Sequence, residues 1–314
     1  MKLLYLFVGY FLIISLFAIG LTLHDKRAAR RGEWRIRERT LLIVSALGGS
    51  VAMFVTMRII HHKTRHKKFM VGIPAIFVIQ VAIVVVVSLF YFGILAFNNP
   101  SDKDFPVRGV DVSSYQGEID WNVLSRQGIG FAYIKATEGG SLQDKQFPIN
   151  FTEASKTGLF IGAYHFFRFE DTADSQFANI IKTVPQDAHM LPVAVDVEFY
   201  DGNDKNPPPK ETVVSEINAL LEKLTAYYGK KPVIYATPEA YDLYVAGGFP
   251  DYSIWYRDVI SYPTLSDGRR FAFWQFSNRS RFTGYHGTER YMDADVWNGG
   301  IKEWEQFVNG TPSP

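Results

Sequence analysis

The chain of 314 residues contains no cysteine. A disulfide framework, a zinc site with cysteine ligands and a thiol nucleophile are therefore excluded. The chain also lacks an excess of one charge, because 33 Lys and Arg residues stand against 32 Asp and Glu residues, for a formal net charge of +1. A near-neutral chain gives no electrostatic reason to expect nucleic acid as a partner, and none is predicted. The length allows one barrel-sized domain and a smaller segment.

Long apolar runs are abundant in the first third of the sequence. The runs at residues 3–23 and 69–97 both exceed the roughly 20 residues that a helix needs to cross a bilayer. A third run, 41–60, is about as long but is interrupted by Gly48-Gly49-Ser50. The first run is longer than the core of a signal peptide and precedes no small-residue cleavage site, which favours an anchor. We predict an α-helical transmembrane region over residues 1–97, with the lipid bilayer as its partner.

The basic segments of this region leave its topology open. Residues 25–39 and 61–68 are both rich in Lys and Arg, so the positive-inside rule places both in the cytoplasm. Three complete crossings would place them on opposite faces. Either the run 41–60 enters the bilayer and turns back at its Gly-Gly pair, or it crosses and one basic loop lies outside. In both arrangements, a cytoplasmic loop at 61–68 places the chain from residue 98 onward outside.

Residues 98–106 are polar and are predicted to be a linker. Strand and helix patterns alternate after it. Strands are predicted at residues 108–112, 131–136, 161–167, 191–197, 232–236, 253–256, 271–276 and 291–296. Asp120 and Gly128 are suited to begin and end a helix over Trp121–Gln127, and a second helical pattern runs over 214–228 to Gly229.

Eight strands alternating with helices favour a parallel sheet that closes into a barrel with helices outside. The predicted fold class is α/β, an irregular TIM-like β/α barrel over residues 107–310 that follows the α-helical transmembrane region. We expect the irregularity in the second half, because little sequence remains for helices after Tyr235.

Polar residues collect where the predicted strands end, which is where barrels of this kind carry their active sites. They are Asp111, Glu138, His165, Asp196, Glu198, Arg257, Asp258, Gln275 and Asp293. Asp196 and Glu198 are two apart on a strand, so both side chains point to one face with Cα atoms about 6.5–7 Å apart. Two carboxyl groups so close raise the pKa of one of them. A protonated carboxyl beside an ionised one is the pairing that glycoside cleavage uses.

An Asp-x-Glu pair alone is also compatible with two solvated acids or with a divalent metal site. Asp111 and Asp293 favour an acidic cleft, and aromatic residues supply faces that stack on sugar rings. These aromatic residues are Tyr115, Tyr164, Phe167, Tyr235, Trp255 and Trp274, of which about half should be core packing. The few histidines are scattered, and His61, His62 and His66 lack a recognised ligand spacing. We predict no metal site and no cofactor.

Several motifs occur in order from Arg108 to Trp297. They are Gly109-Val110-Asp111-Val112-Ser113 with Gln116, Tyr133-Ile134-Lys135-Ala136-Thr137-Glu138-Gly139, Gly162-Ala163-Tyr164-His165-Phe166, Asp196-Val197-Glu198, Pro232-Val233-Ile234-Tyr235, Trp274-Gln275-Phe276 and Met292-Asp293. In these motifs the sequence resembles the family 25 glycoside hydrolases, which are lysozymes with an irregular β/α barrel.

The resemblance implies an enzyme that cleaves the β-1,4 bond between N-acetylmuramic acid and N-acetylglucosamine in peptidoglycan. It implies Glu198 as the general acid and Asp196 as the residue that stabilises the intermediate by orienting the substrate's N-acetyl group. The residues expected to bind the glycan strand are Asp111, Asp293, Glu138, Tyr164, Tyr235, Trp255 and Gln275. One departure is Asp295, where the family usually has Asn.

The first third resembles a bacterial membrane family known as domain of unknown function 1294. The matching residues are Asp25-Lys26, Leu47-Gly48-Gly49-Ser50, His62-Lys63-Thr64 and Gly72-Ile73-Pro74. This resemblance implies a membrane location. The predicted protein is a lysozyme of a bacterial cell membrane with its catalytic domain outside, active in cell-wall turnover. Two alternatives are a non-catalytic tether that binds peptidoglycan and a chitin-directed hydrolase, which also uses an Asp-x-Glu pair.

Overall fold

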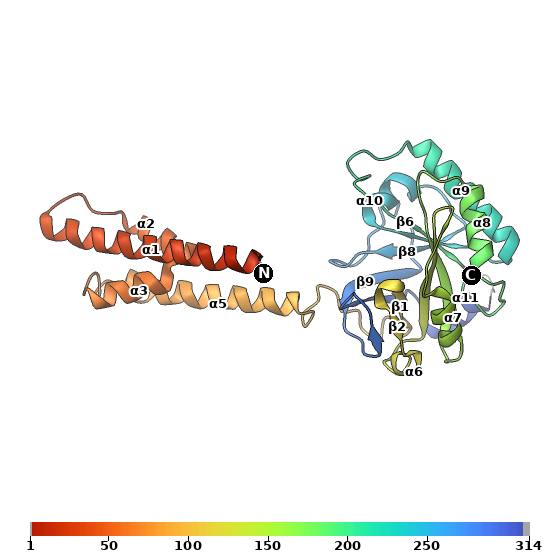
Figure 1. Cartoon of the computed structure of the whole chain (residues 1–314), viewed down its shortest axis with the longest axis horizontal. Coiled ribbons are helices and arrows are strands. Elements are labelled where there is room, and N and C mark those ends of the chain that lie inside the picture. Colours follow the sequence, from red (N-terminus) through yellow and green to blue (C-terminus); the bar gives the residue numbers. More distant parts are fainter. Residues whose placement is uncertain (1, 310–314) are drawn as a thin grey trace. The chain divides into compact units, whose positions relative to one another are not determined.

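The computed structural model describes residues 2–309, so residue 310, the predicted end of the barrel domain, lies outside the described part. The chain divides between Leu95 and Ala96 into two compact units, here called the helical unit and the barrel unit. The helical unit contains α1 (Lys2–Arg31), α2 (Glu38–Val44), the π-helical turn η1 (Ser45–Gly49), α3 (Ser50–Ile59), α4 (Lys67–Met70) and α5 (Gly72–Tyr91) (Figure 1).

The helical unit has a small core and an apolar exterior. Its buried cluster includes Ala18, Leu41, Met53 and Phe69, which come from four helices. Most apolar side chains of α1 and α5 are exposed instead. Three stretches, Tyr5–Arg31, Glu38–Ile59 and Lys67–Tyr91, are long and apolar enough to cross a membrane. Exposed apolar helices of this length are suited to a lipid environment.

Eight strands close the barrel unit into a barrel. They are β1 (Arg108–Val112), β3 (Phe131–Glu138), β5 (Phe160–Phe166), β6 (Ala194–Val197), β7 (Val233–Ala236), β8 (Ser253–Arg257), β9 (Phe273–Ser280) and β11 (Met292–Trp297). The strand β11 is antiparallel to its neighbours β1 and β9, and the other pairings around the barrel are parallel. The predicted α/β barrel is therefore confirmed, with each strand within a few residues of its expected position.

Short elements complete the sheet structure. Strand β4 (Leu142–Gln143) pairs antiparallel with the end of β3, and β2 (Glu118–Ile119) pairs with β10 (Tyr285–His286) in a separate ribbon. The helical elements are η2 (Ser114–Gln116), α6 (Trp121–Leu124), α7 (Phe147–Ser155), α8 (Ala173–Thr183), α9 (Lys210–Tyr228), α10 (Pro238–Ala240), η3 (Tyr241–Val245) and α11 (Ile301–Val308).

Helix ends follow the expected local chemistry. The Asp120 carboxylate accepts hydrogen bonds from the N–H groups of Asn122 and Val123, and Gly229 ends α9 with φ of 69°. Helix α6 is shorter than predicted and ends at Leu124. Residues 258–272, between β8 and β9, contain no helix. The barrel is irregular in its second half, as expected.

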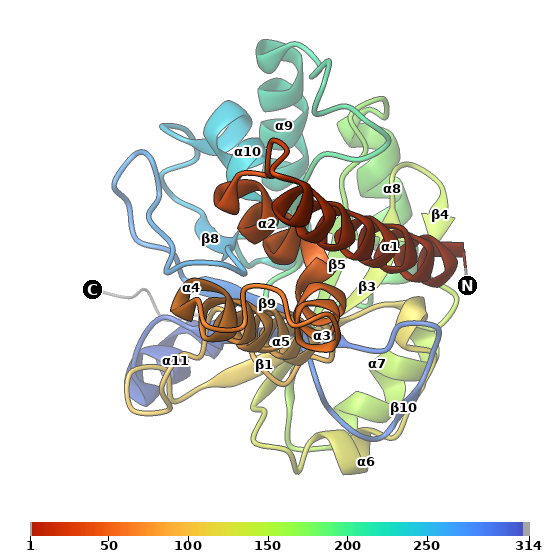
Figure 2. The same cartoon turned by 90° about the vertical axis from the view of Figure 1, so that its left-hand side faces the viewer.

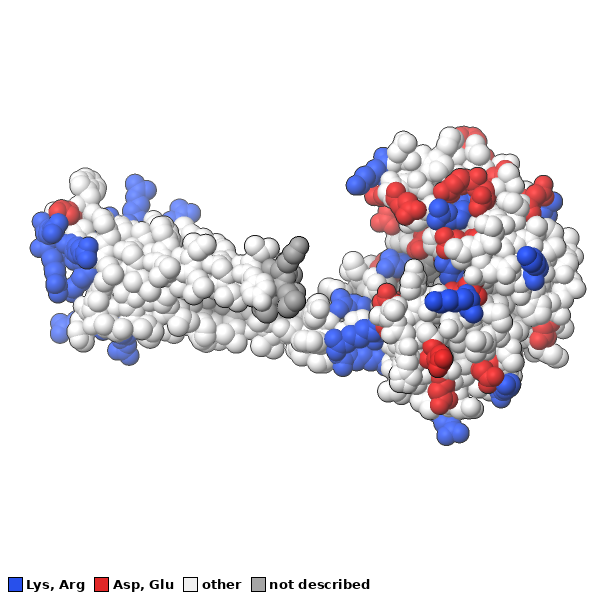
Figure 3. Space-filling model, viewed as in Figure 1, with Lys and Arg blue, Asp and Glu red and all other residues white. Residues whose placement is uncertain are grey.

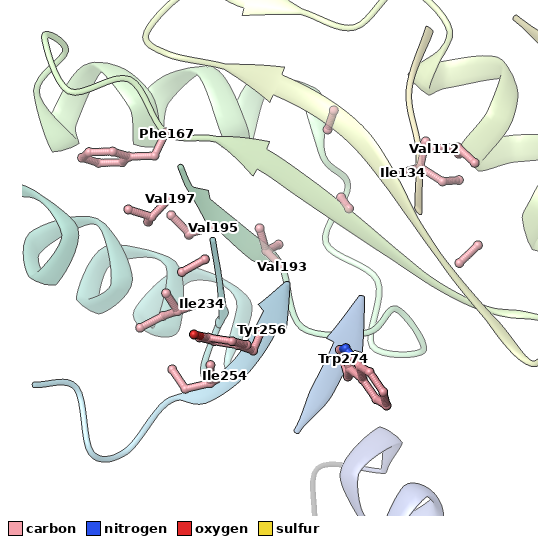
Figure 4. Close-up of a cluster of buried hydrophobic side chains, with 14 of the residues drawn as sticks. Val112, Ile134, Phe167, Val193, Val195, Val197, Ile234, Ile254, Tyr256 and Trp274 are labelled. Carbon is pink, nitrogen blue, oxygen red and sulfur yellow. The ribbon is translucent and has the colours of Figure 1, made fainter. Parts of the chain in front are cut away.

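Successive side chains along each strand point alternately out of and into the barrel, which produces two apolar layers. Side chains such as Val195, Val197 and Ile254 point outward to the helices (Figure 4). Large rings point inward, and the ring centroids of Tyr133 and Trp255 lie 4.9 Å apart. A Cβ atom on Gly162 would come within 2.3 Å of the Tyr133 ring, so only glycine leaves room for that ring. The rings fill the lower barrel, and polar side chains are left at the rim.

The segment 98–106, predicted to be a linker, packs against the barrel. The Asn98 amide donates to the backbone oxygens of Asp258 and Phe276, at 2.9 and 3.3 Å. Phe105 is buried, and its ring centroid lies 5.7 Å from that of Trp274. Contacts with the barrel therefore begin ahead of β1.

Candidate active site

A cavity of about 550 Å³ opens at the rim where the parallel strands end. All nine side chains predicted from sequence to act on the substrate line it. They are Asp111, Glu138, Tyr164, Asp196, Glu198, Tyr235, Trp255, Gln275 and Asp293. They meet because the carboxyl ends of parallel strands share one edge, and because β11 enters at that same edge.

Asp196 and Glu198 lie at the end of β6. Asp196 is 7% exposed, and its Oδ1 has no hydrogen-bond partner among the described residues. Burial raises the pKa of Asp196 well above the ordinary value, and the nearby Glu198 charge raises it further. Burial also raises the pKa of Glu198, against the opposing charges of Arg257 and Lys135. The pair therefore retains a proton at a pH where exposed carboxyl groups have lost theirs.

A hydrogen-bonded chain fixes Asp111 on the opposite side of the cavity. The Tyr235 hydroxyl donates to Gln275 Oε1 at 3.0 Å, and Gln275 Nε2 donates to Asp111 Oδ2 at 2.6 Å. Asp293 is the cross-strand neighbour of Asp111. Burial raises the pKa of Asp111 and of Asp293 well above the ordinary value, and repulsion between neighbouring carboxylates adds to this.

Asp295 lies one inward position below Asp293 and is fully buried. Its Oδ1 accepts a hydrogen bond from Trp255 Nε1 at 2.8 Å. It is also within hydrogen-bonding reach of Asp111, yet its Oδ2 has no donor among the described residues. Two ionised carboxylates cannot bond to each other, so this contact requires a proton on one of them. Burial raises the pKa of both groups, so one of them keeps its proton at a pH where exposed carboxyl groups are ionised.

The rim also carries cations that the sequence analysis did not select. Glu138 forms ion pairs with Lys135 at 2.8 Å and with Arg168 at 3.1 Å. The Arg168 guanidinium lies 4.2 Å from the centroid of the Tyr200 ring. Lys135 was predictable, because it is two positions after the inward Tyr133 on one strand. Arg168 and Tyr200 lie on loops, where periodicity gives no direction.

Three residues in the sequence argument take other positions. His165 is buried between Thr137 Oγ1 and Gln176 Oε1, each 2.8 Å from a ring nitrogen, and burial lowers its pKa to about 4. It faces away from the cavity because Tyr164 and Phe166, on either side of it, face inward. Phe167 and Trp274 belong to the outer core. Their positions agree with the expectation that about half of the aromatic residues are packing.

Trp255 borders the cavity but offers little of its ring. It is 2% exposed and contacts Tyr133 and Tyr235, with ring centroids 4.9 Å apart in both cases. Tyr115, in contrast, is 61% exposed at the cavity edge. Trp255 forms the cavity floor, and Tyr115 has a ring face open to the cavity edge. Among residues 2–309, no group of three or more His, Asp or Glu side chains is arranged to hold a metal ion.

Known proteins share both parts of the chain. Residues 110–285 match the family described as glycosyl hydrolases family 25, and residues 15–69 match a protein family of unknown function, DUF1294. The solved structure of a family 25 glycosyl hydrolase from Bacillus anthracis has 45% sequence identity and a TM-score of 0.64. The match covers 67% of this chain and 96% of that one.

Two sequence relatives extend over similar lengths. Uncharacterized protein YegX of Escherichia coli K12 is 33% identical over 211 residues, which are 66% of this chain and 75% of the relative. Lysozyme M1 of Streptomyces globisporus is 28% identical over 218 residues, which are 65% of this chain and 72% of the relative. Both matches have the length of the barrel unit.

Proposed function

Because the chain belongs to the family 25 glycosyl hydrolases, we propose that its barrel is a lysozyme that cleaves the β-1,4 bond between N-acetylmuramic acid and N-acetylglucosamine. The observation that carries this proposal is the Asp196–Glu198 pair at the cavity, in which Asp196 is buried and Glu198 is half-buried. One acceptor oxygen of this pair, Asp196 Oδ1, has no partner in the described chain.

The two acids have different tasks in this proposal. Glu198 is less buried, is protonated through its raised pKa, and donates its proton to the glycosidic oxygen as the bond breaks. Burial raises the pKa of both acids, so the pair shares one proton. In the proposed substrate complex this proton is on Glu198 and Asp196 is ionised, a charge that the nearby Lys135 favours. Its unpartnered Oδ1 accepts the N–H of the substrate's N-acetyl group. This contact directs the acetyl oxygen at the anomeric carbon, where positive charge develops.

One cation at the cavity, Arg257, supports peptidoglycan over chitin as the substrate. Muramic acid carries a lactyl group whose carboxyl is either free or joined to a peptide with carboxylates of its own, whereas chitin is neutral. Arg257 lines the cavity and forms no ion pair with the residues that the structure describes. A guanidinium in this position suits a carboxylate of the substrate. We therefore propose peptidoglycan glycan strands as the substrate and cell-wall turnover as the process.

We also propose that the helical unit anchors the enzyme in a bacterial cell membrane, with the barrel on the extracytoplasmic side. The three apolar stretches support the anchor. The wall polymer lies outside that membrane, so a catalytic barrel must be outside to reach it.

The test is turnover of purified peptidoglycan by the full chain in detergent, with the products identified by mass. The unmodified protein should release fragments with N-acetylmuramic acid at the reducing end. Glu198→Gln should lower the rate by about 10²–10⁴-fold while binding to the insoluble substrate persists. Glu118→Gln, at an exposed site, is the matched control.

Two outcomes would overturn parts of the proposal. Binding without turnover by the unmodified protein would indicate a tether. Turnover of chitin that exceeds turnover of peptidoglycan would indicate the chitin-directed alternative.

A further inference from the structure

The charged residues of the helical unit are strongly segregated. Between residues 3 and 97, every Lys, Arg, Asp and Glu falls from Asp25 to Lys68, and residues 40–57 contain none. The sequence alone divides these charges between two loops on either side of an apolar stretch, and so leaves the topology open. Figure 3 shows the basic side chains gathered at one end of the helical unit, here called the basic end.

A single buried carboxylate binds both ends of the apolar stretch Glu38–Ile59. Asp25 is fully buried, and its Oδ1 accepts a hydrogen bond from the N–H of Ile36 at 3.1 Å, just before the stretch. Its Oδ2 contacts His62 Nε2 at 2.7 Å and Lys63 Nζ at 2.8 Å, just after the stretch. The start and the end of the stretch therefore lie at the same place.

A second contact gives the same result with different residues. Lys68 Nζ lies 3.3 Å from Glu38 Oε2, although the whole stretch separates them in sequence. A straight helix of 22 residues would hold its ends about 33 Å apart. The stretch is long enough to cross a membrane only if it is straight, and these contacts require it to reverse. In Figure 2, α2 lies beside α1 and α3 lies beside α5.

The reversal takes place at the Gly48–Gly49 pair in η1. Gly48 has φ of 115°, in the region that favours glycine, and a Cβ atom there would lie 2.8 Å from the Phe11 ring of α1. A Cβ atom on Gly49 would lie 2.8 Å from that of Ala18, also on α1. The two glycines allow the turn and its close approach to α1.

Side chains from α1 and α5 bind backbone oxygens of the turn. Gln80 Nε2 donates to the oxygens of Ser45 and Ala46 at 3.0 and 2.8 Å, and the Tyr10 hydroxyl donates to the oxygen of Leu47 at 2.7 Å. Gln80 Oε1 accepts from the Ser50 hydroxyl at 2.7 Å. Gln80 is near the midpoint of the 20-residue α5. Non-helical backbone at this membrane depth is stable only where protein groups bind it.

We propose that the helical unit crosses the bilayer twice, through α1 and α5, and that α2, η1 and α3 form a re-entrant hairpin whose tip lies near mid-depth. The basic end then lies at the cytoplasmic headgroups, where the positive-inside rule places it. The start of α1 and the chain after α5 lie on the outer side. This inference does not depend on what the barrel hydrolyses.

The absence of cysteine makes the topology testable with single-cysteine variants of the full chain, because the unmodified protein is an unlabelled background. Trp34→Cys and Arg65→Cys replace exposed side chains on the two basic loops, and Ser101→Cys lies after α5. In protoplasts, a membrane-impermeant maleimide should label Ser101→Cys at once. It should label the other two variants only after lysis. Labelling of Trp34→Cys and Arg65→Cys from opposite sides, or of both from outside, would overturn the proposal.

A cross-linking measurement tests the reversal independently of orientation. In the double variant Glu38→Cys/Lys68→Cys, a short bismaleimide should join the two cysteines within one chain. In the control Glu38→Cys/Ser101→Cys, it should not. Failure of the first pair to cross-link, with both cysteines labelled by a monofunctional maleimide, would contradict the hairpin. Turnover of peptidoglycan is measured separately on the same variants, so failure of the topology and failure of the proposed activity are distinguishable.

Discussion

The two units of the chain differ in the partners that they provide for buried carboxyl groups. In the helical unit, Asp25 is surrounded by an amide N–H, a histidine and a lysine that bind both of its oxygens. In the barrel unit, Asp196 and Asp295 are also buried, yet each has one oxygen without a donor among the described residues. Buried charge with partners stabilises a fold, whereas buried charge without partners is costly and indicates a binding or catalytic role.

The largest expected effect comes from neutralising the barrel pair. Asp196→Asn should lower the turnover rate by about 10²–10⁴-fold, because the amide cannot hold a negative charge beside the reacting sugar. It should also raise the free energy of unfolding of the barrel at neutral pH, by on the order of 1 kcal/mol, because a buried like charge is removed. Turnover and thermal unfolding are measured on the same preparation. A variant that keeps its activity, or that loses stability, would contradict the view that the unpartnered Asp196 serves catalysis at a cost in stability.

The corresponding change in the helical unit should act only on stability. Asp25→Asn leaves the buried Lys63 without a counter-charge and should cost about 3–5 kcal/mol. The measurement is thermal unfolding of the full chain in detergent, followed by far-UV circular dichroism. The double variant Asp25→Asn/Lys63→Met removes both charges and should recover part of the loss. Equal stabilities of the single and double variants would show that the pairing is not what stabilises this end.

A smaller effect is expected at the hairpin tip. Gly48→Ala forces a side chain into a left-handed backbone and against Phe11, which should cost about 1–2 kcal/mol. Gly20→Ala, in α1 with nothing within 4 Å of the added Cβ, is the control and should be neutral or slightly stabilising. The same unfolding experiment compares the two. Equal responses would mean that the turn does not need its glycine.

The smallest effect concerns pH. Asp111, Asp293 and Asp295 have folded pKa values raised above those of the unfolded chain, so the folded barrel binds more protons. The stability from these protons is complete below the unfolded pKa of about 4 and is lost as the pH rises through the raised values. Thermal unfolding should therefore occur at higher temperature near pH 5 than near pH 8. Asp295→Asn should flatten this dependence and alter turnover little, because an amide also donates to Asp111. A stability that rises with pH would refute this assignment.

Much of the barrel was predictable because its determinants are local. Apolar strands, the Asp120 cap and the alternation that points Asp196 and Glu198 the same way all depend on residues within a few positions of each other. Alternation also places His165 on the opposite face from Tyr164, which the analysis of strand ends had overlooked. Arg168 was not predictable, because a loop has no fixed periodicity.

The helical unit was less predictable, because contacts between residues far apart in sequence determine its structure. Length and hydropathy alone do not separate a crossing helix from one that turns back. The deciding contacts join Asp25 to His62, and Gln80 to Ser45, across long stretches of sequence. Similarly, the exposure of Trp255 depends on how rings from several strands fill the barrel. The sequence pattern placed Trp255 near the end of a strand. Only the packing shows that its ring forms the floor of the cavity.

The candidate cleft is complete only when the barrel is closed. Asp111 lies on the first strand and Asp293 on the last, and they meet only when β1 and β11 pair. In the proposed orientation, the helical unit emerges from the ribosome and enters the membrane first, and the barrel sequence then passes outward strand by strand. The cleft remains incomplete until nearly the whole chain has been translocated. A chain that is stalled or truncated before β11 lacks Asp293, so in the proposed function it would have no complete cleft.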